Sequence, residues 1–198
     1  IKSIHENNYI LAKFPRQSGK SITVAAYLTW YAIFNKNKNA IILAHQKAMS
    51  VEQLSRIKAI IQELPIWMQQ PVIRWNESSI GFSNGTRISA SATQTKSVRG
   101  FTVNFLYLDE FAFVEPHIAN AFISSVFPTI SSMTTAKVVI TSTPNGMNHF
   151  HEMWTKALSK VTSGIPLDDK DFRTLEIAWN AVPGRTDEWK KKEIEKIG

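Results

Sequence analysis

The sequence predicts an α/β fold in which helices flank a mostly parallel β-sheet. Short apolar runs with strand character alternate along the chain with segments whose apolar residues recur at helical spacing, and this alternation is typical of such folds. A Gly-Lys-Ser sequence separates the first run from the first helical segment, and a later run ends in two adjacent acids. With 198 residues, of which 43% are hydrophobic, the chain is long enough to bury a sizeable core.

The predicted elements follow one another in a regular order. Strand patterns cover residues 9–14, 40–44, 103–108, 138–142 and 175–179. Helical patterns cover residues 21–34, 48–64, 116–130 and 149–158. Pro116 suits the first turn of the third helix. Residues 1–5 resemble the end of a helix already under way, so we expect the chain to be a fragment of a longer protein.

Two segments depart from this order. Residues 72–92 alternate with period two, and the pair Asn84-Gly85 favours a type I′ turn, so we expect a β-hairpin inserted at an edge of the sheet. Residues 164–171 combine Gly, Pro and charged residues without periodicity, which is typical of a linker.

Composition excludes several classes of protein. The chain has no cysteine, so disulfides, thiolate catalysis and Cys-based zinc sites are ruled out. Its longest apolar stretch, residues 24–34, is too short to span a bilayer, and we expect no membrane partner. Lysine and arginine exceed the acids by 23 − 16 = 7, and the resulting net charge of +7 favours a polyanionic partner.

Residues 15–21, with the sequence PRQSGKS, are typical of a phosphate-binding loop because they lie between a strand and a helix. In such a loop backbone amides face an anion, and Gly19 lets the backbone approach it. Lys20 would neutralise the β- and γ-phosphates of a nucleotide, and the Ser21 hydroxyl would hold Mg²⁺. The match is incomplete, since Phe14 occupies the position of the motif's first glycine. The alternative is an ordinary surface turn.

A second motif supports the first. The strand pattern over residues 103–108 ends in Asp109-Glu110, at the carboxyl edge where parallel sheets bind ligands. We expect Asp109 to hold Mg²⁺ and Glu110 to orient and deprotonate an attacking water. Burying adjacent carboxylates requires a cation and hydrogen bonds to compensate them. The alternative is that both acids cap the following helix.

The order of the two motifs narrows the fold class. At least one strand, residues 40–44, separates the loop from the acids, and a glutamate directly follows the metal-binding aspartate. This order is typical of the RecA-like branch of P-loop NTPases. The predicted fold is therefore a RecA-like P-loop NTPase with a β-hairpin insertion.

A third motif follows the strand pattern over residues 138–142. Thr141, Ser142 and Thr143 would deliver hydroxyl groups to the same edge, where they can sense the γ-phosphate. The alternative is an ordinary strand followed by a Pro-Asn-Gly turn.

Two arginines are candidates for a role in phosphoryl transfer. Arg16 lies inside the predicted loop, and Arg99 lies ten residues before Asp109. Most arginines are solvated surface charges, which is the alternative for both. An arginine finger, however, accelerates phosphoryl transfer by roughly 10³ to 10⁵, so a motor that waits for its neighbour gains by receiving it across a subunit boundary.

These motifs together strongly resemble the large terminase subunit of tailed bacteriophages, closest to the T-even type. The resemblance runs over nearly the whole chain and includes less distinctive segments, residues 146–150 and 177–180. It is carried by residues 16–21 (RQSGKS), 42–45 (ILAH), 97–100 (SVRG), 106–110 (LYLDE) and 141–146 (TSTPNG).

The resemblance implies an Mg²⁺-dependent ATPase and assigns roles to residues. The nucleotide would be bound by residues of the loop: Arg16, Gln17, Ser18, Gly19, Lys20 and Ser21. The early arginine of that family's deviant loop matches Arg16 and explains the missing glycine. Catalysis would involve Glu110, Arg16 and Arg99, with Arg99 reaching a neighbouring subunit. Ser21 and Asp109 would hold the metal, and Thr141, Ser142 and Thr143 would couple hydrolysis to movement.

The resemblance also implies domains and partners. Residues 1–163 would form the ATPase core, and residues 164–198 the linker and the C-terminal part of the ATPase domain. The family's adenine-reading motif would precede Ile1 and its nuclease domain would follow Gly198, so we expect no nuclease activity, and we interpret Asp168, Asp169 and Asp171 as linker. The partners would be double-stranded DNA, the portal protein and the small terminase subunit, in the host cytoplasm, with a homo-oligomeric ring on the portal.

Two other functions are compatible with part of the sequence. One is a helicase-like or remodelling P-loop ATPase that acts on double-stranded nucleic acid. The other is a non-catalytic module that binds DNA through its positive charge. The intact Lys20, Ser21, Asp109 and Glu110 argue against the second.

Overall fold

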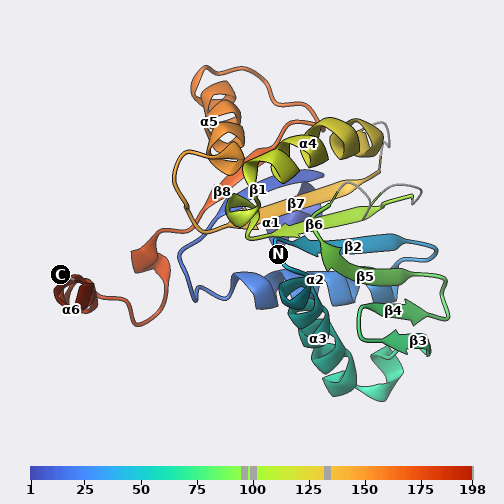
Figure 1. The fold of residues 1–198 in the computed structure, drawn as a ribbon. Helices are drawn as coiled ribbons and strands as arrows, with labels where there is room; N and C mark the ends of the chain where they lie inside the picture. Colours follow the sequence, from blue (N-terminus) through green and yellow to red (C-terminus); the bar gives the residue numbers. More distant parts are fainter. Residues whose placement is uncertain (95–97, 99–101, 132–134, 198) are drawn as a thin grey trace.

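The computed structural model describes residues 1–94, 98, 102–131 and 135–197. Within these residues the strands form one eight-stranded sheet in the order β3-β4-β5-β2-β6-β7-β1-β8. Helices cover both faces of this sheet (Figure 1). In the described part of the chain, only the pairings β3–β4 and β4–β5 are antiparallel, and the remaining pairings are parallel. The predicted α/β fold with a mostly parallel sheet is confirmed.

The elements have the following bounds. The strands are β1 (Tyr9–Lys13), β2 (Asn39–Ala44), β3 (Val72–Asn76), β4 (Ser79–Phe82), β5 (Arg87–Ala92), β6 (Phe105–Asp109), β7 (Lys137–Ser142) and β8 (Arg173–Glu176). The α-helices are α1 (Lys2–Glu6), α2 (Lys20–Phe34), α3 (Lys47–Glu63), α4 (Pro116–Ser131), α5 (His149–Thr162) and α6 (Asp187–Ile197). Short 3₁₀ helices are η1 (Ile66–Met68), η3 (Phe111–Phe113) and η4 (Trp179–Ala181).

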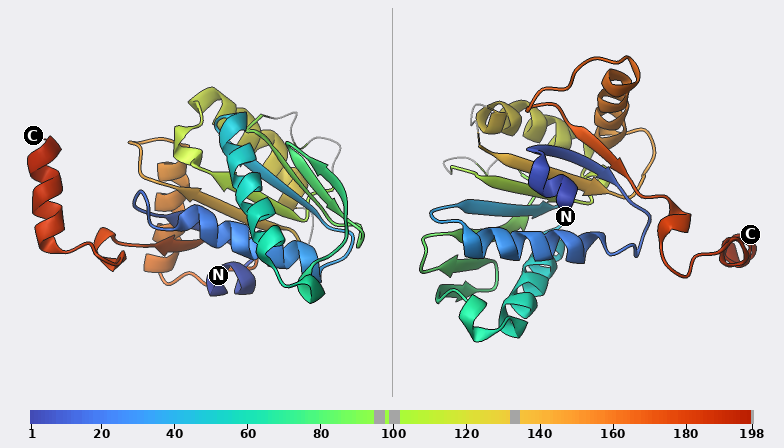
Figure 2. Two further views of the ribbon diagram at one scale, coloured as in Figure 1. Left: turned by 90° about the horizontal axis from the view of Figure 1, so that it is seen from below. Right: turned by 180° about the vertical axis from the view of Figure 1, so that it is seen from behind.

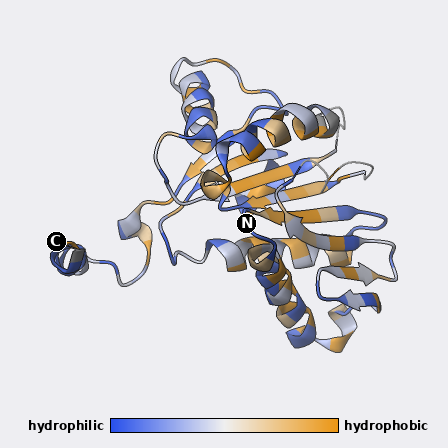
Figure 3. Ribbon diagram, in the orientation of Figure 1, coloured by the Kyte–Doolittle hydropathy of each residue, from blue (hydrophilic) through white to orange (hydrophobic). Residues whose placement is uncertain are grey.

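Alternating side chains of the central strands pack into two cores, one on each face of the sheet. Ile10 and Ile42 belong to the core beneath α1, α2 and α3, whereas Leu11 and Leu43 belong to the core beneath α4 and α5. The two helical layers are seen from other sides in Figure 2. Figure 3 shows the apolar residues concentrated in the central strands. Both faces are buried, which explains why these strands are continuous apolar runs.

The predicted hairpin insertion is confirmed, but the predicted type I′ turn is wrong. That turn requires positive φ angles at both central residues, and of Asn84 and Gly85 only Gly85 has one, at 80°. The Asn84 side chain is used elsewhere: its Nδ2 donates to the carbonyls of Ala32 (2.8 Å) and Asn35 (3.0 Å) at the C-terminal end of α2. Satisfying unpaired helix carbonyls outweighs the local preference of the turn.

The C-terminal part begins with a loop and ends in a projecting helix. Residues 164–171 form neither helix nor strand, as predicted. The last strand ends earlier than predicted, because β8 pairs with β1 only as far as Lys13↔Glu176 and Trp179 begins η4. α6 extends away from the body of the protein (Figures 1 and 2). Within the described ranges, no helix is both long and apolar enough to cross a membrane.

The Asn84 contacts generate a prediction about stability. We expect Asn84→Ala to lower the free energy of unfolding by about 1–3 kcal/mol, because carbonyls at the end of α2 lose their hydrogen-bond donor. Urea denaturation measures the change. The exposed Asn180→Ala is the matched control and should stay within about 0.5 kcal/mol of the unsubstituted protein. Equal stability of both variants would contradict the capping role of Asn84.

Candidate active site

The predicted phosphate loop connects β1 to α2. The Phe14 amide donates to the Ser142 carbonyl (3.1 Å), which carries the pairing of β1 and β7 into the start of the loop. The loop then turns back, and α2 begins at Lys20, one residue earlier than predicted. The N-cap residue of α2 is Gly19, which has no side chain to cap the first turn, so the backbone amides of that turn can donate to an anion.

The conformation of the loop depends on two residues with left-handed backbone. Gln17 has a φ of 55° and Gly19 a φ of 78°. Glycine adopts this region without steric cost, whereas a side chain at position 19 would be strained. Ser18 Oγ donates to the Pro15 carbonyl (2.8 Å) and closes the loop. The loop is therefore a compact turn that presents backbone to the cavity described below.

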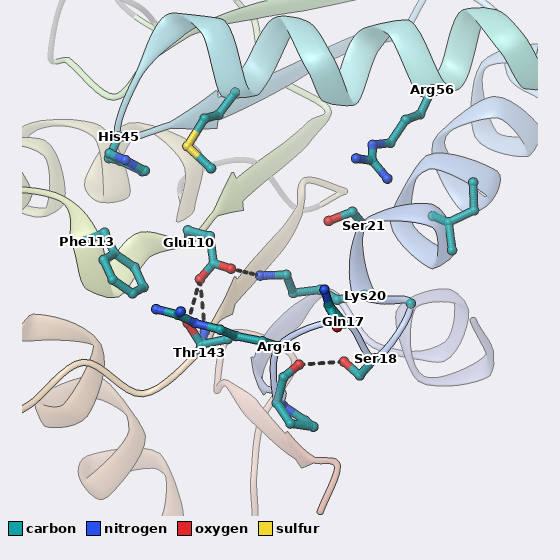
Figure 4. Close-up of a pocket in the computed structure, with 14 residues that line it drawn as sticks. Arg16, Gln17, Ser18, Lys20, Ser21, His45, Arg56, Glu110, Phe113 and Thr143 are labelled. Atoms are coloured by element: carbon teal, nitrogen blue, oxygen red, sulfur yellow. Dashed lines mark hydrogen bonds and ion pairs between the residues drawn. The ribbon is translucent and has the colours of Figure 1, made fainter. Parts of the chain in front are cut away.

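Lys20 brings the loop and the two acids together. Its side chain is only 8% exposed, its Nζ pairs with Glu110 Oε1 (Figure 4), and the same Nζ lies 3.4 Å from Asp109 Oδ1. Asp109 itself is 3% exposed. The acids thus compensate a buried cation, and Glu110 makes no side-chain capping bond to η3. The capping alternative does not hold for Glu110.

Glu110 occupies a strained position at the end of β6. Its φ of 51° and ψ of 46° lie in the left-handed region, which costs a non-glycine residue about 1–3 kcal/mol. Strain of this kind clusters at functional sites. The turn brings its carboxylate within contact of both Lys20 and Thr143.

Asp109 is fixed by neutral donors from three elements. Its Oδ1 accepts hydrogen bonds from Tyr107 Oη (2.9 Å) on β6 and Thr141 Oγ1 (3.1 Å) on β7. Its Oδ2 accepts from Gln53 Nε2 (2.9 Å) on α3. Burial and the negative charge of Asp109 raise the pKa of Tyr107 well above its ordinary value. The phenol is therefore protonated and acts as a donor.

The end of β7 holds the other carboxylate. Glu110 Oε2 accepts from the Thr143 amide (3.0 Å), from Thr143 Oγ1 (3.2 Å) and from Ser142 Oγ (3.3 Å). Burial raises the pKa of Glu110, but the hydrogen bonds from Lys20 and Thr143 together lower it by more than burial raises it. The net pKa of Glu110 therefore lies below its ordinary value. Glu110 is therefore ionised at neutral pH.

These groups border a cavity of about 470 Å³, which we call the loop cavity. It lies at the carboxyl edge of the parallel strands, where such sheets bind ligands. Figure 4 shows Arg16 extending across it toward Thr143 and Phe113, with Ser21 on the opposite side. Its lining residues are Pro15, Arg16, Gln17, Ser18, Gly19, Lys20, Ser21, Ile22, His45, Met49, Arg56, Glu110, Phe113 and Thr143.

Most sequence-predicted site residues converge here. All six residues of the predicted nucleotide loop line the loop cavity together with Glu110 and Thr143. Asp109, Thr141 and Ser142 are connected to this wall by hydrogen bonds. Thr141 Oγ1 donates to Asp109, and Ser142 Oγ donates to Glu110. Arg99 lies outside the residues that the structure describes.

Sequence reasoning missed five residues of the cavity wall: Ile22, His45, Met49, Arg56 and Phe113. His45 could have been found, because it directly follows β2, whose last residue Ala44 is paired with Asp109 in parallel register. Met49 and Arg56 lie seven residues apart on α3, a spacing that does not distinguish a cavity wall from a solvated helix face.

The residues present fit a magnesium ion. Ser21 and Asp109 offer hard oxygen ligands, which Mg²⁺ prefers, and the ion is commonly held by one or two carboxylates together with substrate phosphates. Among the described residues no group of three or more acids and histidines could hold a metal by itself. A metal at this site would therefore depend on phosphate oxygens for the rest of its shell.

Known structures share this fold. The large terminase of the thermophilic bacteriophage D6E matches 96% of this chain with a TM-score of 0.67 and 14% identity, and 45% of that chain is covered. The large terminase ATPase domain of Thermus phage P74-26 matches 98% of this chain with a TM-score of 0.70 and 19% identity, and 86% of that chain is covered. The HK97 bacteriophage large terminase matches 96% with a TM-score of 0.70 and 15% identity, covered over 43%.

The chain thus spans less than half the length of the D6E and HK97 large terminases and most of the P74-26 ATPase domain. Structures of the D6E protein were solved with ADP and with ATP-γ-S. At these identities the likeness establishes the fold, which is the RecA-like P-loop fold of terminase ATPase domains.

The sequence itself matches a family model described as "Terminase large subunit, T4likevirus-type, N-terminal" over residues 11–197. The chain therefore belongs to the T4-like family of terminase large subunits and corresponds to their N-terminal region.

Proposed function

We propose that this chain is the ATP-hydrolysing motor domain of a viral DNA-packaging terminase. In this role it couples ATP hydrolysis to the translocation of double-stranded DNA into a procapsid. One observation carries the proposal: the buried Lys20 joins the phosphate loop to Asp109 and Glu110 at the wall of the loop cavity. Family membership supports the packaging role.

The loop cavity binds the triphosphate of ATP. The amides of the loop and of the first turn of α2 donate to phosphate oxygens, and Lys20 neutralises charge on the β- and γ-phosphates. Ser21 and Asp109 would hold Mg²⁺, and the bound ion would supply further positive charge against the phosphates. Arg16 extends into the same cavity (Figure 4) and contributes a second positive charge.

Glu110 acts as the base. When the phosphates draw Lys20 away, Glu110 loses a hydrogen bond that lowers its pKa, and its carboxylate becomes a stronger proton acceptor. It takes a proton from the water that attacks the γ-phosphorus, and the bond from that phosphorus to the bridging oxygen of ADP breaks. The bonds from Thr143 keep the carboxylate oriented during this exchange.

Thr141, Ser142 and Thr143 couple the chemistry to movement. Thr141 bonds to Asp109, and Ser142 and Thr143 bond to Glu110. A change in the partners of either acid therefore alters hydrogen bonds at the end of β7 and in the loop that follows it. This loop leads to α5, which is capped by Asn148.

Arg99 completes the active site of a neighbouring subunit as an arginine finger. In the assembled motor, subunits form a ring on the portal and contact double-stranded DNA and the small terminase subunit in the host cytoplasm. The net charge of +7 is compatible with DNA contact. A motor must release each phosphate that it grips, so this contact should be weak and sensitive to salt.

Two substitutions separate binding from catalysis. Lys20→Ala should weaken nucleotide binding by about 100-fold or more, since it removes the cation that faces the phosphates. Glu110→Gln should leave binding within a few fold and lower kcat by about 10² to 10⁴, because the amide cannot accept the proton. Fluorescent-nucleotide titration and phosphate release in the assembled motor measure the two effects.

The matched controls for these substitutions are Lys36→Ala and Glu115→Gln, both at exposed positions. Neither should change binding or turnover. Normal turnover by Glu110→Gln would show that another group accepts the proton.

The role of Arg99 predicts complementation between subunits. Arg99→Ala and Glu110→Gln subunits should each be inactive in the assembled motor, and mixtures should recover part of the ATPase rate, because each subunit supplies what the other lacks. Arg74→Ala, at an exposed position on β3, is the control and should neither lose activity nor rescue Glu110→Gln beyond simple dilution. Failure to recover activity at every mixing ratio would exclude action across the subunit boundary.

A further inference from the structure

Gln53 connects α3 to Asp109. It lies in the middle of α3 and is 6% exposed. Leu54, Ile57 and Ile61 of the same helix are buried in the core beneath the sheet and anchor the helix there. Gln53 Nε2 donates to Asp109 Oδ2 (2.9 Å). A buried amide on a rigid helix therefore fixes one oxygen of this carboxylate.

The surroundings of Asp109 give the bond from Gln53 a particular effect. Tyr107 and Thr141 both donate to Oδ1, whereas Gln53 donates to Oδ2. Donors on both oxygens fix the rotation of the carboxylate, and an ionised carboxylate keeps lone pairs for a further ligand. These three donors are neutral, and the cation that Asp109 faces is Lys20, whose Nζ lies 3.4 Å from Oδ1.

The second polar atom of Gln53 has no hydrogen-bond partner in the described part of the protein. Its Oε1 is buried and, among the described residues, finds no hydrogen-bond donor. The amide orientation is not interchangeable, because exchanging N and O would direct an acceptor at the Asp109 carboxylate. A buried acceptor without a partner is costly, and a missing water or ion commonly explains one. This oxygen sits on the same amide group that contacts Asp109.

We propose that Gln53 is a positioning residue for the metal site. It orients Asp109 through Nε2, and its Oε1 accepts a hydrogen bond from a water molecule bound to Mg²⁺. The inference rests on the proposed function, in which Asp109 holds Mg²⁺. Mg²⁺ usually retains several of its waters in protein sites, and partners beyond the direct ligands set metal affinity.

The test measures metal affinity directly and does not depend on turnover. Mn²⁺ replaces Mg²⁺, and its binding to the chain in the presence of ATP-γ-S is titrated by electron paramagnetic resonance. Gln53→Met preserves the size of the side chain but removes its amide. Gln53→Asn keeps the amide on a shorter side chain, which moves it away from Asp109. Gln62→Met, at an exposed position on α3, is the matched control. Thermal unfolding and ATP-γ-S binding without metal are measured for each variant.

We expect both Gln53 variants to raise the Kd for Mn²⁺ by about tenfold or more, while Gln62→Met leaves it unchanged and metal-free ATP-γ-S binding stays constant. Unchanged Mn²⁺ affinity in folded Gln53 variants would overturn the inference and leave the proposed function standing. A loss of metal-free ATP-γ-S binding as large as the loss of Mn²⁺ binding would also overturn the inference, because Gln53 would then support the whole site. Absence of nucleotide-dependent Mn²⁺ binding in the unsubstituted chain would instead contradict the proposed metal site.

Discussion

The structure depends on burying the Lys20 ammonium group against two carboxylates at the edge of the sheet. Removing three charges from water is strongly unfavourable unless each finds close partners. Lys20 faces Asp109 and Glu110, and donors from α3, β6 and β7 satisfy the remaining carboxylate oxygens. The cluster is therefore stable without a ligand, yet it retains a cation that a triphosphate can attract. Binding then becomes an exchange of partners for Lys20 and avoids exposing an unpaired charge.

Parallel pairing explains how residues far apart in the sequence reach this cluster. In the register of the sheet, Asp109 is paired with Thr141 and Lys13 with Ser142. The chain therefore leaves β1, β6 and β7 at the same edge, and each exit carries one of the three motifs. The left-handed backbone at Gly19 and Glu110 turns the chain sharply at two of these exits. Local strain at Glu110 is tolerated because the surrounding contacts over-determine its position.

Much of this arrangement could be predicted from the sequence. The periodicity of apolar residues reveals the buried strands and helices, and short motifs mark the ends of two of the strands. The loop at residues 15–21 and the acids Asp109 and Glu110 are examples. Contacts that join separate elements could not be predicted. The Asn84-Gly85 pair predicted a local turn, whereas the Asn84 side chain caps α2. Gln53 has no motif, and its bond to Asp109 follows only from how α3 packs on the sheet.

A crystal structure of the chain with Mg²⁺ and ATP-γ-S tests the central claim most directly. The account predicts the triphosphate in the loop cavity, with Lys20 Nζ on the β- and γ-phosphates and no longer paired with Glu110, while Thr143 still bonds to Glu110. A nucleotide bound elsewhere, or a triphosphate in the cavity with Lys20 still paired to Glu110, would contradict it.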